Sequence, residues 1–442
     1  MRFLSSRQLP RAVRYAAAAL ACVAARAAVT PAQPVTRAAA LDAALRRGPR
    51  IAAAAADTSA ALAAVRTAQA LANPNLALSY SKAVPRLHAI VDYPLLDAFF
   101  LRPGRGAAAL SLREAATLRF AAARAAILVD VDTTYTRALA ADARARLTRR
   151  TAADGAELRR IAQARRDAGD ASDLDVRLAN VSAGQLANAA AADSLAAVTA
   201  LISVQVAMGM SPDSVTIVLA DTLTDSPADV RTATVPTDTV PTGAASGRDP
   251  AIAQPPAASP IAVDRLLTVA AAESSLRAAQ RSLGVAQLGR YGVPSITAGI
   301  ESVDPSGTER GLLPTFGISL PLPFLSRNAG LVGAAQAERD RATAELAVAR
   351  LEAAGALARA QRDRAAASTR LARDRALAAD AEAVAAMALR AYQEGASPLP
   401  NVLQARRDAR DVLAQTVEDR AAVWNATAVL RAASLTIDRP AP

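Results

Sequence analysis

The sequence contains very few of the residues on which disulfide scaffolds, metal sites and large-side-chain cores depend. Aromatic residues make up 3% of its 442 residues, and it has one cysteine and one histidine. A single cysteine excludes an internal disulfide framework. Most of the apolar residues are alanine, which buries little area per residue. The composition therefore favours long helices that pack closely through small side chains.

The residue patterns of common enzyme sites are also missing. No zinc-ligand spacing, phosphate-binding glycine loop or nucleophile elbow occurs in the sequence. The one histidine, His88, falls in an expected strand and is interpreted as a polar residue of that strand. We therefore expect a protein that is not an enzyme and that has no metal and no cofactor.

The N-terminus has the pattern of an export signal. Arginines precede an apolar run, residues 15–25, which is too short to span a bilayer as a helix. Cleavage after Ala27 removes five arginines and no acidic residue, so the formal charge falls from +11 to +6 and a nucleic-acid partner is not expected. The alternative is lipid attachment at Cys22, although Ala19 stands where such sites usually have leucine.

The remaining sequence repeats one order of elements. Gly169 aligns with Gly395, and Asp175 then aligns with Asn401. The first repeat, residues 28–220, is expected to hold a helix, a strand pair at 74–96, a long helix at 105–167, a tip turn at 168–173 and a return helix. The second repeat, residues 263–437, is expected to hold a helix, a strand pair at 293–321, a long helix at 328–394, a tip turn at 395–400 and a return helix. Residues 221–262 are interpreted as a linker or equatorial segment, and residues 438–442 as a flexible tail.

Each long helix lacks internal proline and would extend about 95 to 100 Å. Glycine favours the left-handed conformation that ends a helix, so Gly169 and Gly395 predict the tips of two helical hairpins.

The expected strands alternate apolar and polar residues, as in Leu76, Leu78 and Tyr80. This pattern is typical of outer-membrane barrels, and a small soluble sheet with one wet face is the alternative. Four strands cannot close a barrel, and open edges are costly in lipid. Several copies must therefore share one barrel, and two, three or four copies remain open.

The segments AYQEGASPLPNVLQA and GISLPLPF, together with the order of elements, resemble the TolC-like outer membrane efflux proteins, the outer membrane factors of tripartite efflux systems. The resemblance implies a mainly α fold with a transmembrane β-barrel. Long helical hairpins would form a periplasmic tube, and a homotrimer would share a 12-stranded barrel. The implied partners are a periplasmic adaptor (membrane fusion protein), an inner-membrane pump and the lipid of the outer membrane.

The resemblance also implies two sets of site residues. Adaptor contact is expected at the tips, at Gly169, Asp170, Ser172, Gly395, Ser397 and Pro398. The periplasmic constriction is expected at Asp175, Tyr392, Asn401 and Gln404. Family members often carry acidic residues after the second tip, where Asn401 and Gln404 are neutral here. Asp175 is thus expected to supply the remaining negative charge, and the alternative is a role at the helix N-terminus.

The sequence therefore predicts a passive outer-membrane channel with a periplasmic extension, working with a pump and an adaptor. One alternative is a type I secretion conduit for polypeptides, and another is a periplasmic coiled-coil scaffold. No residue identifies the transported substrate.

Overall fold

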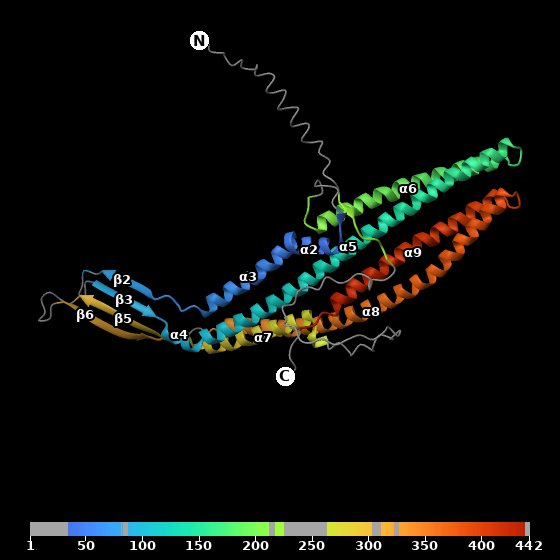
Figure 1. The fold of residues 1–442 in the computed structure, drawn as a ribbon. Helices are drawn as coiled ribbons and strands as arrows, with labels where there is room; N and C mark the ends of the chain where they lie inside the picture. Colours follow the sequence, from blue (N-terminus) through green and yellow to red (C-terminus); the bar gives the residue numbers. More distant parts are fainter. Residues whose placement is uncertain are drawn as a thin grey trace, which may run out of the picture.

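The computed structural model describes residues 34–80, 82, 87–211, 217–224, 263–302, 311–321 and 327–437. The expected export signal, Cys22, residues 225–262 of the expected linker and the tail at 438–442 lie outside the described residues. The described chain is elongated, with a β-sheet at one end and two helical tips at the other (Figure 1).

Both repeats of the sequence form a helical segment, a strand pair, a long helix and a return helix, and the first repeat also contains the short helix α4. The first contains α2 (Arg37–Arg47), α3 (Pro49–Gln69), β2 (Asn75–Tyr80), β3 (Leu87–Tyr93), α4 (Leu95–Phe100), α5 (Arg102–Asp167) and α6 (Asp173–Ala207). The second contains α7 (Leu267–Leu288), β5 (Ser295–Ser302), β6 (Leu312–Ser319), α8 (Ala329–Gln393) and α9 (Leu399–Ala433). With 66 and 65 residues, α5 and α8 are each about 100 Å long.

Small residues allow these helices to approach one another. α5 contacts α3 and α7 near the sheet and α6 near the tips, and it also contacts α9. The buried positions of α5 are mostly alanine, glycine, serine and threonine. A Cβ atom at Gly155 would lie 2.7 Å from the Leu186 side chain of α6, so a larger residue would displace that side chain. The packing through small side chains follows from the composition.

The boundaries differ from the expected ones at two prolines. β3 ends at Tyr93, before residue 96, because Pro94 lacks the N–H that would continue the ladder, and α4 follows. The first helical run divides at Gly48, and Pro49 begins α3.

The four long strands form one antiparallel sheet in the order β2-β3-β5-β6. The register of the sheet places the alternating apolar side chains of all four strands on the same face. Leu78 pairs with Ala89, Ala89 with Ile300, and Ile300 with Pro314. On the opposite face, Ser79 pairs with His88, and His88 with Glu301.

The apolar face is the more exposed of the two. Phe316 is 80% exposed, Tyr80 75% and Ile318 71%. On the polar face, His88, Asp92 and Thr297 are only partly exposed. A sheet in a soluble protein buries its apolar face and exposes its polar face, and this sheet shows the opposite pattern.

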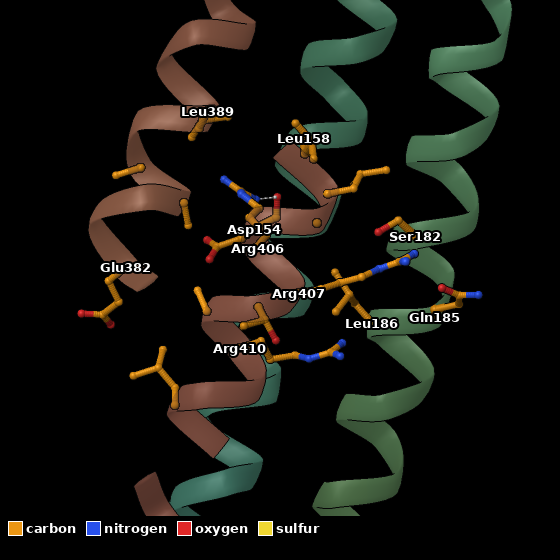
Figure 2. A pocket seen from close by; sticks show the side chains of 17 residues that line it. Asp154, Leu158, Ser182, Gln185, Leu186, Glu382, Leu389, Arg406, Arg407 and Arg410 are labelled. Atoms are coloured by element: carbon orange, nitrogen blue, oxygen red, sulfur yellow. Dashed lines mark hydrogen bonds between the residues drawn. The ribbon is translucent and has the colours of Figure 1, made fainter. Parts of the chain in front are cut away.

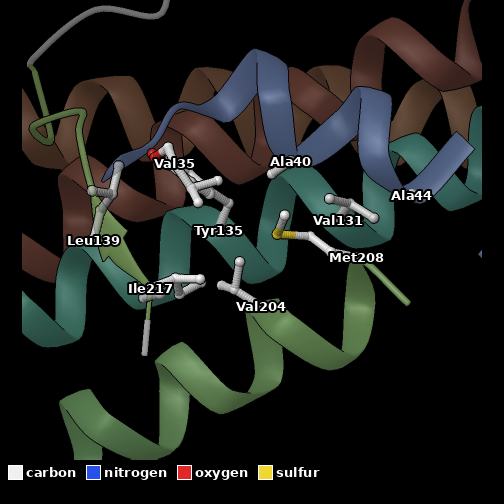
Figure 3. Close-up of a cluster of buried hydrophobic side chains, with 10 residues drawn as sticks. Val35, Ala40, Ala44, Val131, Tyr135, Leu139, Val204, Met208 and Ile217 are labelled. Carbon is white, nitrogen blue, oxygen red and sulfur yellow. The ribbon is translucent and has the colours of Figure 1, made fainter. Parts of the chain in front are cut away.

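A buried cluster joins the N-terminal segment to α5 and α6 (Figure 3). A short parallel sheet of β1 (Pro34–Val35) and β4 (Val218–Leu219) lies beside it. Val35, Tyr135, Leu139 and Val204 pack together there.

Beside this cluster Arg37 is 7% exposed. Its guanidinium carbon lies 4.1 Å from the centre of the Trp424 ring and 5.4 Å from that of the Tyr135 ring, and it forms an ion pair with Asp132. The Asp221 carboxylate accepts hydrogen bonds from the Arg37 backbone N–H (2.6 Å) and the Tyr135 hydroxyl (2.9 Å). Burial, followed by that hydrogen bond, raises the pKa of Tyr135. These contacts thus connect α2, α5 and α9, which are far apart in the sequence, with the segment that holds Asp221.

Candidate site at the helical tips

Both tips use the same backbone turn. Gly169 and Gly395 have φ values of 86° and 78°, the left-handed region that favours glycine. Asp170 N–H donates to the Arg165 carbonyl at 2.8 Å, and Ala396 N–H donates to the Ala391 carbonyl at 2.8 Å. With the shorter-range bonds of the two glycine N–H groups, these contacts form a Schellman motif at each helix end.

The return helices begin differently. Ser172 caps α6, and its hydroxyl accepts the Asp175 N–H at 3.2 Å. The Asp175 carboxylate in turn accepts the Ser172 N–H at 3.2 Å, which completes a capping box. α9 begins after Pro398 without a side-chain cap. The Asn401 amide instead donates to the Ser397 hydroxyl at 3.2 Å.

The two tips are held together by a small apolar core. Its buried members are Leu158, Ala162, Ala179, Tyr392, Leu399 and Val402. They come from α5, α6, α8 and α9, so each hairpin contributes both of its helices.

Tyr392, which is expected at the constriction, is buried at the tips. Its side chain is 2% exposed and packs in the core between the two hairpins. Burial raises the pKa of Tyr392, and the Arg165 guanidinium beside its ring partly offsets this rise. Its hydroxyl has no hydrogen-bond partner.

Arg165 connects the two tips through polar contacts that the sequence did not reveal. Its guanidinium lies 4.7 Å from the centre of the Tyr392 ring. One terminal nitrogen donates to the Tyr392 carbonyl, and the other donates to the Asp170 carbonyl at 3.3 Å. In the sequence Arg165 is one of many helical arginines, and neither spacing nor charge distinguishes it.

The other expected site residues lie near the tips. The exposed ones are Gly169, Asp170, Ser172, Gly395, Pro398, Asn401 and Gln404. Ser397 and Asp175 are partly exposed. The Gln404 amide donates to the Asp408 carboxylate at 2.8 Å, so it is occupied within α9.

A groove lies between the hairpins on the sheet side of this core (Figure 2). It encloses a cavity of about 390 Å³. Arg406 in its wall donates to the Asp154 carbonyl at 3.0 Å, and Arg407 and Arg410 also line it. Leu158, Leu186 and Leu389 supply apolar wall. The groove lies between the two hairpins of one chain and presents both cationic and apolar surface.

Two other findings bear on what the chain can do. Among the described residues, no group of three or more His, Cys, Asp or Glu side chains could hold a metal ion. Within the same residues, α6 is the one helix long and apolar enough to cross a membrane, and 22% of its most apolar window is buried. Since α6 packs along α5 as one arm of a hairpin, this apolarity is weak support for a helical span.

Comparisons with known proteins support the fold. No protein-family model matches the chain, and no curated protein matches it. The solved structure of VceC, an outer membrane protein of Vibrio cholerae, has a TM-score of 0.68 at 16% identity, over 90% of this chain and 95% of that chain. The Campylobacter jejuni CmeC outer membrane channel has a TM-score of 0.70 at 14% identity, over 90% and 85%. The open-state Neisseria gonorrhoeae MtrE outer membrane channel has a TM-score of 0.66 at 18% identity, over 89% and 88%.

These similarities show that the chain has the same fold as these solved outer-membrane channel structures. At these identities the similarity establishes the fold alone. The expected fold class, mainly α with long hairpins and four strands in each chain, is confirmed.

Proposed function

We propose that the chain is an outer-membrane channel that conducts substrates passively from an inner-membrane pump and a periplasmic adaptor to the exterior. Three copies share one β-barrel in the outer membrane, and their helical hairpins form a tube through the periplasm. The channel residues act by lining and closing this path, and the pump supplies the energy.

The inverted burial of the sheet carries this proposal. The register places apolar side chains on one face in all four strands, and this face is the more exposed one. Hydrocarbon is the environment in which such a face is stable, and the polar face then lines an aqueous lumen. A periplasmic scaffold with a soluble sheet would bury the apolar face.

The open sheet requires further copies. β2 and β6 are its edges, and in lipid every unpaired backbone group costs several kcal/mol. Closed spanning barrels have at least about eight strands. Three copies of the four-stranded sheet supply 12 strands, the number that the resemblance implies.

Two exposed tips at the far end of the helices suit a docking role. Gly169, Asp170 and Pro398 stand at the ends of the hairpins, about 100 Å from the sheet by the length of α5. At this distance the tips can meet an adaptor below the membrane. A photo-crosslinker at Asp170 is expected to capture the adaptor in cells, and one at Leu351 on the mid-length surface of α8 is the control.

Membrane fractionation with mass measurement in detergent tests the channel itself. We expect the chain in the outer-membrane fraction, insoluble without detergent, with the mass of three chains. A water-soluble single chain, or one released from membranes by high salt, would refute the proposal.

Crosslinking between copies tests barrel closure. Cysteines at Leu78 on β2 and Phe316 on β6, joined by a short flexible linker, are expected to give a ladder of two and three chains. The matched control places cysteines at Ala89 and Ile300, which are register partners within one sheet. This pair is expected to crosslink within one chain and to give no ladder.

A further inference from the structure

Large apolar side chains are exposed around the end of the sheet that faces the helices. We call them the junction collar: Leu71 (55% exposed), Phe99 (68%), Phe100 (63%), Leu288 (60%), Leu320 (60%) and Leu331 (66%). They come from five separate segments, each within a few residues of a strand or helix end at this junction. Side chains this apolar and this exposed need a partner.

A buried ion pair fixes the orientation of α4 and thereby of Phe99. Asp97 is 8% exposed, and its carboxylate accepts two hydrogen bonds from Arg105 of α5, at 2.8 and 2.5 Å. Two residues further along a helix point to nearly the opposite side. Because Asp97 faces α5, Phe99 faces away from the protein.

The collar continues the apolar face of the sheet. Leu320 follows Ile318 by two residues, so the alternation of β6 extends to it. On the other side, the Asn328 amide donates to the Gly289 carbonyl at 3.1 Å. This bond holds the start of α8 beside the end of α7, and so brings Leu331 near Leu288.

A second copy of the chain covers only part of the collar. Copies that complete the barrel pair through the edge strands β2 and β6. Phe99 and Phe100 follow β3, and Leu288 precedes β5, which are the two central strands. These positions lie away from both edges, so lipid is the partner that remains for them.

Exposed arginines occur among the collar residues. Arg290 stands two residues after Leu288, and Arg327 precedes the start of α8. Leucine and phenylalanine with flanking arginine match the boundary between acyl chains and phosphate headgroups.

We propose that the junction collar is a phospholipid-binding belt in the periplasmic leaflet, so that the membrane contact extends past the strands onto α4 and the adjoining ends of α7 and α8. This inference rests on the proposed outer-membrane location. It assigns α4 to the lipid interface, with Phe99 and Phe100 in contact with acyl chains near the headgroups.

Environment-sensitive labels on single cysteines test the belt. The labelled variants are Phe99→Cys and Leu288→Cys in the collar, Phe316→Cys on the sheet, and Leu351→Cys on α8, which is 75% exposed. The parent chain, whose one cysteine is Cys22, gives the background. Each variant is purified as the assembled protein and placed in phosphatidylethanolamine and phosphatidylglycerol vesicles, with a quencher on lipid chains or iodide in the water.

We expect lipid-borne quenchers to quench the labels at 99 and 288 severalfold more than the label at 351, and iodide to show the reverse order. We expect the label at 99 to be quenched more strongly by a quencher near the headgroup than by one deep in the membrane. For the label at 316 we expect the deep quencher to act more strongly.

Two results would overturn the belt while leaving the channel proposal intact. In the first, labels at 99 and 288 behave like the label at 351 while 316 is quenched by lipid. In the second, they are shielded from both quenchers, which would show burial against protein. If the label at 316 is also reached by iodide and not by lipid, the channel proposal fails as well.

Discussion

Arg165 of α5 lies over the ring of Tyr392 of α8, with its guanidinium carbon 4.7 Å from the ring centre, and donates a hydrogen bond to the Tyr392 carbonyl. A second bond reaches the Asp170 carbonyl in the first tip. One cation therefore links the two hairpins within a chain at the level where the tube is expected to narrow. A cation–π contact contributes about 0.5 to 2 kcal/mol, and a hydrogen bond from a charged group about 1.5 to 3 kcal/mol.

The first prediction concerns this link. Arg165→Ala removes all three contacts, so the tips are expected to separate more easily and the single-channel conductance in planar bilayers to rise. Arg166→Ala is the matched control, because Arg166 pairs with Asp167 and Asp173 at the surface. Equal conductance of the two variants and the parent would show that Arg165 does not restrain the tips.

The second prediction tests whether Tyr392 acts by packing in the core between the hairpins or by lining the channel. Its hydroxyl has no hydrogen-bond partner, so Tyr392→Phe is expected to leave conductance unchanged and to preserve or slightly raise stability. Tyr392→Ala empties the core between the hairpins and is expected to cost about 3 to 5 kcal/mol. The measurement is the temperature at which the detergent-solubilised oligomer dissociates. A conductance change in Tyr392→Phe would place the hydroxyl at the lumen after all.

The third prediction tests the charge at the constriction. Asp175 completes the capping box with Ser172, and it is also expected at the constriction. Asp175→Asn keeps an acceptor for the cap, so stability is expected to change by less than about 1 kcal/mol. If three Asp175 carboxylates set the charge of the pore, cation selectivity falls, which the reversal potential in a salt gradient measures. An unchanged reversal potential would leave Asp175 with the capping role alone.

The fourth prediction concerns the buried Arg37. Arg37→Ala leaves Asp132 and the rings of Tyr135 and Trp424 without their cation, and a broken buried pair typically costs about 3 to 5 kcal/mol. Arg46→Ala is the matched control, since Arg46 pairs with Asp42 at the surface at 2.8 Å and an effect below about 1 kcal/mol is expected. Thermal unfolding followed by circular dichroism compares them. Equal losses would show that the buried cluster does not stabilise the fold.

The fifth prediction is a pH dependence in the hairpin of α8 and α9. A hydrogen bond with Asp419, followed by burial, raises the pKa of Asp374 above 3.8. Asp419 is 3% exposed, and Arg370 lies 3.4 Å from its carboxylate. Because the folded state holds the proton more tightly than the unfolded state, this group stabilises the fold at low pH. The stabilisation is lost as the pH rises through the folded pKa.

Asp374→Asn is accordingly expected to flatten the fall in melting temperature as the pH rises from about 4 to 7, relative to the parent chain. The exposed Asp380 on the same helix provides the control variant, Asp380→Asn. If both variants follow the parent at every pH, the folded state does not hold the Asp374 proton more tightly than the unfolded state.

Several features of the fold follow from short-range rules. Gly169 and Gly395 could be identified as helix ends because only glycine adopts the left-handed turn without strain. The apolar alternation of each strand gave its faces before any pairing was known, since side chains alternate with a period of two. Proline explains why some strand and helix ends differ from the predicted ones, as at Pro94, before which β3 ends.

Short-range rules predicted the site at the helical tips only in part. Asp175 was expected near the tip, and it lies there in a capping box, a motif confined to four consecutive residues. Tyr392 was expected at the constriction, and that its side chain is buried between the hairpins could not be predicted. Which face of a long Ala-rich helix meets a neighbour depends on helix rotation, and a sequence with apolar residues on every face does not encode it.

The sequence by itself determined the doubled hairpin, the two tips and the two faces of each strand, because these depend on residues close together in the chain. The tertiary structure decided that all four apolar faces align in one exposed surface, that Arg37 is clamped between Tyr135 and Trp424, and that Arg165 joins the tips. The three arginine contacts join residues 98 to 387 positions apart, and the two strand pairs of the sheet meet across 211 positions, from Ala89 to Ile300. They arise only when chain packing fixes the register of the strands and the rotation of the helices.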